Sequence, residues 1–193
     1  MRTPTPPLTP EQRAHLLATA RRAIRNRVAG RPATVPAPPD PILRAPGAAF
    51  VTLTRAGALR GCIGYVQPIK TLARAVAHCA AAAATEDPRF PAVTAQELPD
   101  LFLDISILSP LRPIAEPTEV QVGLHGLYVS RGSSHGLLLP QVATEQGWDR
   151  NTFLRQACLK AGLPADAWQR GATLQVFTVE RVSDGDPVGE ETI

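Results

Sequence analysis

The sequence contains few aromatic residues and no long apolar run. Aromatic residues make up 5% of the 193 residues, and we expect the two tryptophans, Trp148 and Trp168, at the edge of the core rather than in a base-stacking platform. No apolar stretch approaches the roughly 20 residues of a membrane-spanning helix. The first residues, MRTPTPPLTPEQ, lack the apolar region of a secretory signal. These absences predict a cytoplasmic protein without a membrane segment.

Cysteine is scarce as well, with three residues at positions 62, 79 and 158. An odd number of cysteines without a CxxC pair does not form a disulfide framework and is typical of a reducing, intracellular compartment. The regular cysteine and histidine spacings of zinc and iron–sulfur sites are also missing. We therefore predict no metal site.

The charges are nearly balanced, and the motifs of several cofactor-dependent enzymes are absent. The 20 basic residues exceed the 17 acidic ones by three, which is too small an excess to indicate a nucleic-acid partner. The patterns GxxxxGK[ST], GxGxxG and HExxH do not occur, so phosphate-cradling loops, Rossmann cofactors and zincin chemistry lack their signals. We predict no cofactor.

What the sequence does contain is enough apolar material for a folded core. Apolar residues make up 44% and charged residues 19% of the chain, which excludes disorder for the chain as a whole. A chain of this length buries about 70% of its unfolded surface, so it needs no disulfide or metal to fold. We expect one compact domain or two lobes that share a core.

A helix is predicted near the N-terminus, and a proline-rich connector follows it. Thr9, Pro10 and Gln12 supply capping signals, and apolar residues continue at helical spacing through about Val28. The next stretch, RPATVPAPPDPILRAPG, has six prolines in 17 residues. We therefore expect residues 30–47 to form an extended surface connector without a helix or a central strand.

The remaining segments mix strands and helices irregularly. This order excludes a doubly wound parallel sheet, which needs one helix per strand, and predicts the α+β class with an antiparallel or mixed sheet and flanking helices. The expected elements are a hairpin of strands 48–55 and 59–66, a helix at 69–84, strands at 101–109 and 120–131, a hairpin tip at 131–136 with a short partner strand, a short helix from residue 140, a helix at 150–161 capped by Asp149, and a strand at 172–182.

The most unusual stretch is LRGCIG, at residues 59–64. Two glycines in a strand-like run predict a bulge, or a position where another backbone or a ligand comes close. Simple alternation places Arg60 and Cys62 on one face of the strand, where the arginine could favour the thiolate. If that face is buried, Cys62 is a small apolar filler. The residues alone leave both interpretations open.

Together with further segments in the same order, this stretch resembles the AMMECR domain family, whose bacterial and archaeal members are called AmmeMemoRadiSam system protein A. The hexapeptide is similar to the family's LRGCIG motif. The other similar segments lie between about residues 48 and 180 and are Asp87-Pro88-Arg89-Phe90, Glu97-Leu98, His125-Gly126-Leu127, Leu139-Pro140-Gln141-Val142, Trp148, Phe153-Leu154, Lys160-Ala161-Gly162-Leu163 and Trp168.

The resemblance implies a two-lobed α+β architecture in a single domain. We place that domain at residues 1–183, and we expect residues 184–193 to be a C-terminal tail. A groove near the shared motifs is implied, but no established reaction comes with it, so whether the protein is an enzyme stays open. The family name also implies a Memo-like protein and a radical SAM protein as partners. The oligomeric state is not indicated.

The resemblance also points to six candidate site residues. The candidate catalytic residues are Cys62, as a thiolate nucleophile, and His125, as a proton carrier. Arg60 and Arg89 are candidate ligand-binding residues, because a guanidinium group can hold a carboxylate or phosphate. Two glycines that would permit close approach of a ligand complete the set, namely Gly61 and Gly64.

Each candidate also has a structural interpretation. Arg60 could pair with a nearby acid, Asp104 or Asp87, and Arg89 could anchor its own loop. The thiol could pack under the hairpin, and the histidine could be a turn residue. Two functions are therefore expected as alternatives: an enzyme or enzyme component with a groove around Cys62, or a non-catalytic binding subunit for the Memo-like and radical SAM proteins.

Overall fold

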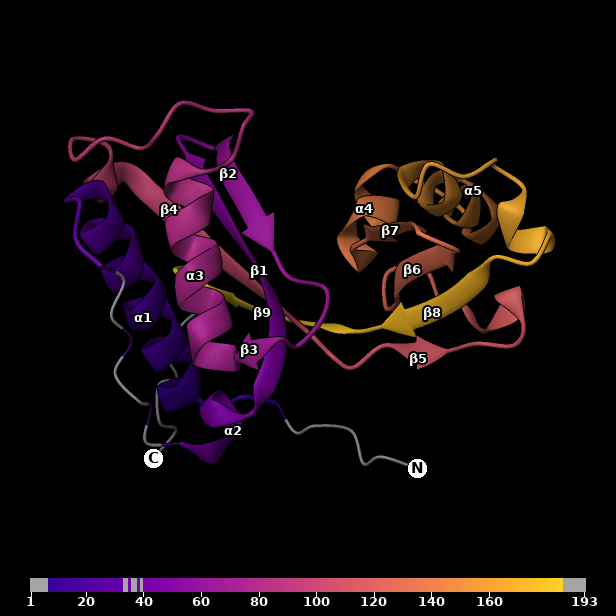
Figure 1. Ribbon diagram of the computed structural model, residues 1–193, viewed down its shortest axis with the longest axis horizontal. Coiled ribbons are helices and arrows are strands. Elements are labelled where there is room, and N and C mark those ends of the chain that lie inside the picture. The colour runs from indigo at the N-terminus through magenta and orange to yellow at the C-terminus, as the bar shows by residue number, and fades with distance from the viewer. Residues whose placement is uncertain (1–6, 33–34, 36–37, 39, 186–193) are drawn as a thin grey trace. The chain divides into compact units, whose positions relative to one another are not determined.

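The computed structural model describes residues 7–32, 35, 38 and 40–185. The chain divides into two compact units (Figure 1). Unit 1 consists of Met1–Ile107 and Glu180–Ile193, and unit 2 consists of Leu108–Val179. Each unit has its own helices and its own sheet with antiparallel strand pairs, so the predicted α+β class is confirmed.

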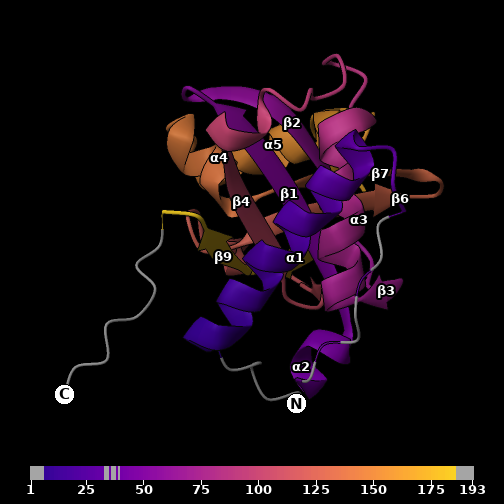
Figure 2. The same cartoon turned by 90° about the vertical axis from the view of Figure 1, so that its left-hand side faces the viewer.

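Unit 1 combines one sheet with two long helices. Its elements are α1 (Pro10–Val28), β1 (Pro46–Arg55), β2 (Ala58–Gly64), β3 (Lys70–Thr71), α3 (Leu72–Thr85), the 3-10 turn η1 (Leu98–Asp100), β4 (Leu101–Leu108) and β9 (Val179–Ser183). The strand order is β2-β1-β4-β9, and β3 pairs with the start of β1. Helix α3 packs on β1 and β2, and α1 packs on α3 (Figure 2).

Helix α1 begins where the sequence predicts. Thr9 accepts the Gln12 N–H at 3.3 Å, and the Gln12 side chain accepts the Thr9 N–H at 2.8 Å, which completes the predicted capping box. The helix ends at Val28, two residues before Gly30, which has a φ of +70°. Its buried face joins the core of unit 1 through residues that include Leu16, Ala20 and Ile24.

The proline-rich connector contains a helix that its composition did not predict. The short helix α2 (Pro41–Arg44) starts after Asp40, whose side chain accepts the Ile42 N–H at 2.8 Å. The prediction of no helix in residues 30–47 was wrong, because a proline in the first helical turn removes no hydrogen bond that the helix needs. Parts of the connector lie outside the described residues, namely 33–34, 36–37 and 39.

Unit 2 contains a smaller sheet covered by two helices. Its elements are β5 (Arg112–Pro113), η2 (Pro117–Glu119), β6 (Gly126–Arg131), β7 (Ser134–Leu138), α4 (Pro140–Glu145), α5 (Arg150–Lys160), η3 (Ala167–Gln169) and β8 (Thr173–Phe177). The strand order is β5-β8-β6-β7. Helix α5 packs on β6 and β7, and α4 packs on β6. As predicted, the Asp149 side chain caps α5 by accepting the Thr152 N–H at 2.7 Å.

The strand predicted at residues 172–182 is two strands in two sheets. Strand β8 belongs to unit 2 and β9 belongs to unit 1. Thr178 separates the two strands and forms two hydrogen bonds with Ser109. The Ser109 N–H donates to the Thr178 carbonyl, and the Ser109 hydroxyl accepts the Thr178 N–H. The prediction of one strand was wrong because an uninterrupted β-forming sequence does not reveal where a chain changes sheets.

The last described residues are anchored in unit 1. Asp184 accepts the Leu103 N–H at 2.7 Å and forms an ion pair with Arg21 of α1. The segment expected as a tail, 184–193, therefore begins with a fixed residue, and residues 186–193 lie outside the described part. Within the described ranges, no helix combines the length and the apolar character needed to cross a membrane.

Candidate functional site

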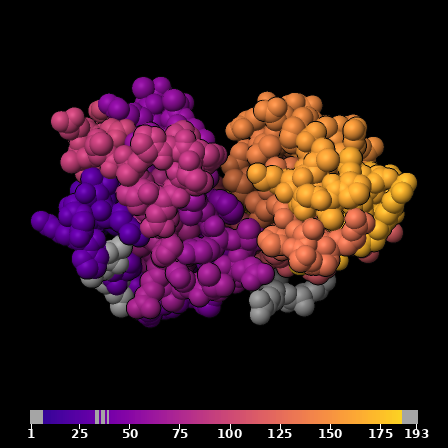
Figure 3. Space-filling view, turned by 45° about the horizontal axis from the view of Figure 1, so that its top comes forward, coloured from indigo at the N-terminus to yellow at the C-terminus, as the bar shows by residue number. Residues whose placement is uncertain are grey.

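The LRGCIG segment lies in β2, at the edge of the unit 1 sheet. The pairing of β2 with β1 shifts after Leu53↔Gly61 and leaves Arg60 without a partner on β1. This β-bulge confirms one prediction made from the glycines. Because a bulge re-aims the side chain of the extra residue, Arg60 reaches the loop 86–97, which lies beside β2 on the surface of unit 1 (Figure 3).

Both glycines of the segment are needed for steric reasons. A Cβ atom on Gly61 would lie 2.0 Å from the carbonyl oxygen of Ala83 in α3. A Cβ atom on Gly64 would lie 2.2 Å from the ring of Phe50. The predicted close approach is therefore confirmed, and at both positions the approaching group belongs to the protein itself.

Cys62 is partly exposed, whereas Cys79 and Cys158 are buried. Thr52 lies opposite Cys62 on β1, and its hydroxyl donates a hydrogen bond to the Cys62 Sγ at 3.4 Å. Burial raises the pKa of Cys79 to about 12 and also raises the pKa of Cys158. Among the three cysteines, Cys62 is thus the one with access to solvent.

Asp87 and Arg89 close the free edge of β2 at Cys62. The Asp87 carboxylate accepts the Cys62 N–H at 2.8 Å, and Arg89 donates to the Cys62 carbonyl at 3.5 Å. Arg89 binds Asp87 through Nε at 2.9 Å and Nη2 at 2.7 Å, and the Asp87 side chain is 2% exposed. This hydrogen bonding to Arg89 holds the pKa of Asp87 well below its usual range. The pair occupies the backbone groups that a neighbouring strand would otherwise bind.

Arg60 is held by the loop that follows α3. Its Nε and Nη2 donate to the two oxygens of Glu97 at 2.8 and 3.2 Å. Its remaining donors bind the carbonyls of Pro91, at 2.7 Å, and Ala92, at 3.3 Å. The side chains of Arg60 and Glu97 are each 13% exposed. Arg60 therefore ties the bulge to the loop.

Arg60 forms a structural ion pair with Glu97, and the predicted partners of that pair were wrong. We expected Asp104 or Asp87, and both acids have other partners. Asp104 pairs with Arg181, and Asp87 pairs with Arg89. The bulge explains the difference, because it turns the Arg60 side chain toward the loop 86–97.

We expect the Arg60–Glu97 ion pair to make the fold less stable in acid. Hydrogen bonding to Arg60 lowers the pKa of Glu97 from 4.5 to about 2. A carboxylate with a lowered folded-state pKa stabilises the fold fully above its unfolded value and loses that contribution as the pH falls through the folded value. The window is thus about pH 4.5 down to about 2. We expect Glu97→Gln to lose roughly 2 kcal/mol at pH 7 and to show a flatter decline in acid.

Urea unfolding followed by far-UV circular dichroism at pH 7, 4.5 and 3 measures this difference. The exposed Glu145→Gln is the matched control, and it should retain the wild-type profile. Identical acid profiles for Glu97→Gln and the wild type would contradict the assignment.

His125 lies in unit 2, whereas the other five predicted site residues lie in unit 1. It is 9% exposed, and its Nδ1 accepts the Gln121 N–H at 3.2 Å. The backbone N–H of His125 also binds the Gln121 carbonyl, at 2.9 Å. Burial lowers the pKa of His125, which favours the neutral ring. This geometry fits the turn interpretation, because the ring nitrogen that accepts a proton is already bound.

Residues 132–136, GSSHG, have the GxSxG spacing of serine hydrolases. The structure places Gly132 and Ser133 in the turn between β6 and β7, and residues 134–136 at the start of β7, where Ser134 pairs with Arg131. A nucleophile elbow requires a sharp turn from a strand into a helix. The spacing therefore has no hydrolase context in this chain.

Three residues have central roles that were not predicted from the sequence, namely Thr52, Asp87 and Glu97. Thr52 faces Cys62 because the two-residue turn at 56–57 and the bulge at Arg60 together set the register between β1 and β2. The roles of the two acids depend on the path of the loop 86–97. Within the part of the chain that the structure describes, no three His, Cys, Asp or Glu side chains gather as a metal site.

Known proteins are similar to this chain in sequence and in architecture. The model of a family described as AMMECR1 matches residues 17–182, a range that runs through both units. A protein of Methanothermobacter thermautotrophicus is 43% identical over 169 residues, covering 84% of this chain and 88% of its own. A protein of Thermofilum pendens is 41% identical over 206 residues, covering 94% and 95%. The crystal structure of the uncharacterized protein PH0010 from Pyrococcus horikoshii matches with a TM-score of 0.82 and 39% identity, over 91% of this chain and 92% of that one.

Proposed function

This chain belongs to the AMMECR1 family, and we propose that it is a cytoplasmic, non-catalytic binding subunit. Its partners are a Memo-like protein and a radical SAM protein, the two classes that the resemblance of the sequence implies. The docking element is the LRGCIG segment of β2.

The observation that carries this proposal is an exposed apolar side chain on a braced strand. Leu59, the first residue of the segment, is 41% exposed. The residues that follow it are held by the ion pair, the close helix contact and the edge hydrogen bonds described above. A rigid element that presents an apolar side chain loses little conformational entropy on binding, so more of the contact energy becomes affinity.

An enzyme component is the second candidate, and the exposure of Cys62 beside the Thr52 hydroxyl favours it. In this alternative the Cys62 thiolate attacks an electrophile. Arg89, whose side chain is 54% exposed, holds an anionic group of the substrate. The binding role ranks first because the donors of Arg60 and the Nδ1 of His125 are already bound within the protein.

Substitution of Leu59 tests the docking element. We expect Leu59→Ser to weaken binding to the purified partner proteins about tenfold, because an apolar contact is lost. Isothermal titration calorimetry measures the affinity. The matched control is Ile69→Ser, which changes a 63% exposed side chain outside the segment. Equal losses for both variants, or no binding of either partner by the wild type at about 100 µM, would sink the proposal.

Cys62→Ala separates the two candidates. Because Cys62 is only partly exposed and contributes a small side chain to the docking element, the binding role predicts that this variant keeps partner affinity within about twofold and leaves the turnover of the assembled partners unchanged. The enzyme role predicts that turnover is abolished while partner affinity is retained, because the nucleophile is gone. Turnover of the reconstituted assembly, with and without the substitution, decides between them.

A further inference from the structure

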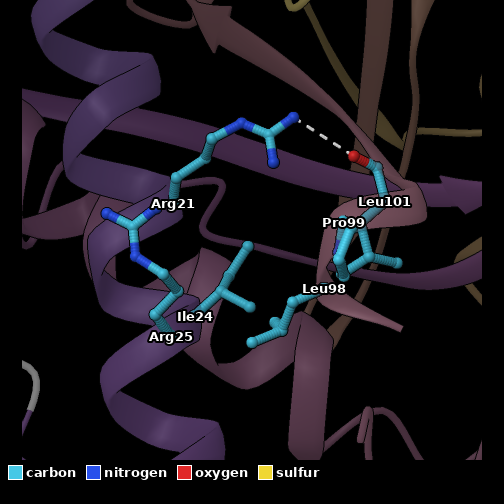
Figure 4. A pocket seen from close by; sticks show the side chains of 6 residues that line it. All are labelled: Arg21, Ile24, Arg25, Leu98, Pro99 and Leu101. Atoms are coloured by element: carbon cyan, nitrogen blue, oxygen red, sulfur yellow. Dashed lines mark hydrogen bonds between the residues drawn. The ribbon is translucent and has the colours of Figure 1, made fainter. Parts of the chain in front are cut away.

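A pocket of about 280 Å³ lies in unit 1, between α1 and the turn that leads into β4, and none of its lining residues belongs to the LRGCIG segment. Figure 4 shows Ile24 of α1 facing Leu98 of η1 across its floor. Pro99 and Leu101 continue this apolar lining. Two guanidinium groups from α1 complete the lining, those of Arg21 and Arg25 (Figure 4).

Arg21 is bound within the protein, whereas the Arg25 side chain has no partner among the residues that the structure describes. Arg21 forms an ion pair with Asp184 and donates to the Leu101 carbonyl at 3.1 Å. Arg25 is exposed, and its side chain has no hydrogen bond or ion pair among the described residues. The pocket thus combines an apolar floor with one positive charge that no described residue pairs.

The acidic side chains near the pocket do not neutralise Arg25, because other arginines hold them. Glu97, next to Leu98 in the chain, is bound by Arg60. Asp100, which follows Pro99, pairs with Arg55 at 3.3 Å. A ligand that brings its own carboxylate therefore meets a cation without having to displace an existing partner.

We propose that this pocket binds an acidic peptide segment of a partner protein, one that places an aliphatic side chain on the Ile24 and Leu98 floor and a neighbouring carboxylate on Arg25. The volume of about 280 Å³ lies just below the range of about 300–1,000 Å³ that is usual for pockets enclosing drug-sized ligands, so the pocket has room for an aliphatic side chain. Burial of the side chain supplies affinity, and the arginine–carboxylate pair supplies orientation. The pocket and the LRGCIG segment have no residue in common, so failure of the proposed function would not overturn this proposal.

Fluorescence anisotropy with labelled hexapeptides tests the site in the full chain. The probe carries one leucine flanked by two glutamates, and the comparison peptides replace either the glutamates by glutamines or the leucine by serine. We expect Arg25→Gln to weaken binding of the first peptide about fivefold and Arg25→Lys to retain most of it. Arg22→Gln is the matched control, because Arg22 lies on the same helix, is exposed and does not line the pocket.

The pattern of losses decides the outcome. The proposal requires that Arg22→Gln changes the affinity less than twofold and that both comparison peptides bind more weakly than the probe. Equal losses for Arg22→Gln and Arg25→Gln would show unspecific attraction to a basic helix and overturn it. The sequence DPVGEETI at residues 186–193 is itself acidic. Tighter probe binding after Glu190→Gln with Glu191→Gln would identify this segment as the occupant and overturn the assignment to a partner protein.

Discussion

Replacing Gly61 by alanine is expected to lower the free energy of unfolding by about 3 kcal/mol or more. The new Cβ atom would lie 2.0 Å from the Ala83 carbonyl oxygen. That oxygen is backbone in the middle of the unit 1 core, so neither α3 nor β2 can yield without separating from the other. Urea unfolding followed by far-UV circular dichroism measures the loss.

Two glycine substitutions provide the controls. Gly57 in the hairpin turn has a φ of +78° and open space around it, so Gly57→Asn should cost no more than about 1 kcal/mol. Gly64→Ala meets the ring of Phe50, a side chain that can move, and an intermediate loss of about 1–3 kcal/mol is expected. Both tryptophans lie in unit 2, so their fluorescence reports that unit during the same titration. A Gly61→Ala protein as stable as Gly57→Asn would disprove the close contact.

Asp87→Asn is expected to destabilise the protein by about 3 kcal/mol. The carboxylate accepts four hydrogen bonds, from the backbone N–H groups of Cys62 and Arg89 and from the Arg89 guanidinium at Nε and Nη2. An asparagine replaces one carboxylate oxygen by an NH₂ group, which cannot accept a hydrogen bond. The N–H groups of Cys62 or Arg89 that face this group therefore lose their acceptor. The loss of charge also weakens the hold of Arg89 on the edge of β2.

Asp100→Asn is the matched control for this loss of an acid. Asp100 is 60% exposed and pairs with Arg55 at 3.3 Å, and exposed pairs of this kind contribute about 0–1 kcal/mol. Hydrogen exchange of the Cys62 amide adds a local readout, and it should speed up in Asp87→Asn and stay slow in Asp100→Asn. Unchanged protection in Asp87→Asn would refute the role of Asp87 as the edge acceptor.

Several elements followed directly from the sequence because their signals are local. The Thr9–Gln12 capping box, the Asp149 cap and the β1–β2 hairpin each depend on residues that are close in the chain. The glycines of LRGCIG also indicated a bulge and a close contact without any knowledge of the partner. The α2 helix was missed because proline content was weighed without regard to its position at a helix start.

The partners in the candidate site depended on tertiary structure. Arg60 and Glu97 are 37 residues apart, and Cys62 and Asp87 are 25 residues apart, so no local pattern reveals which acid meets which group. The assignment of His125 to a different unit, and the division of residues 172–182 between two sheets, likewise follow from chain topology. By itself the sequence determined the α+β class, the family resemblance and the bulged hexapeptide, because capping, periodicity and glycine spacing act over a few residues. Only the fold decided that the polar groups around the hexapeptide brace a strand, because their partners come together through long-range packing.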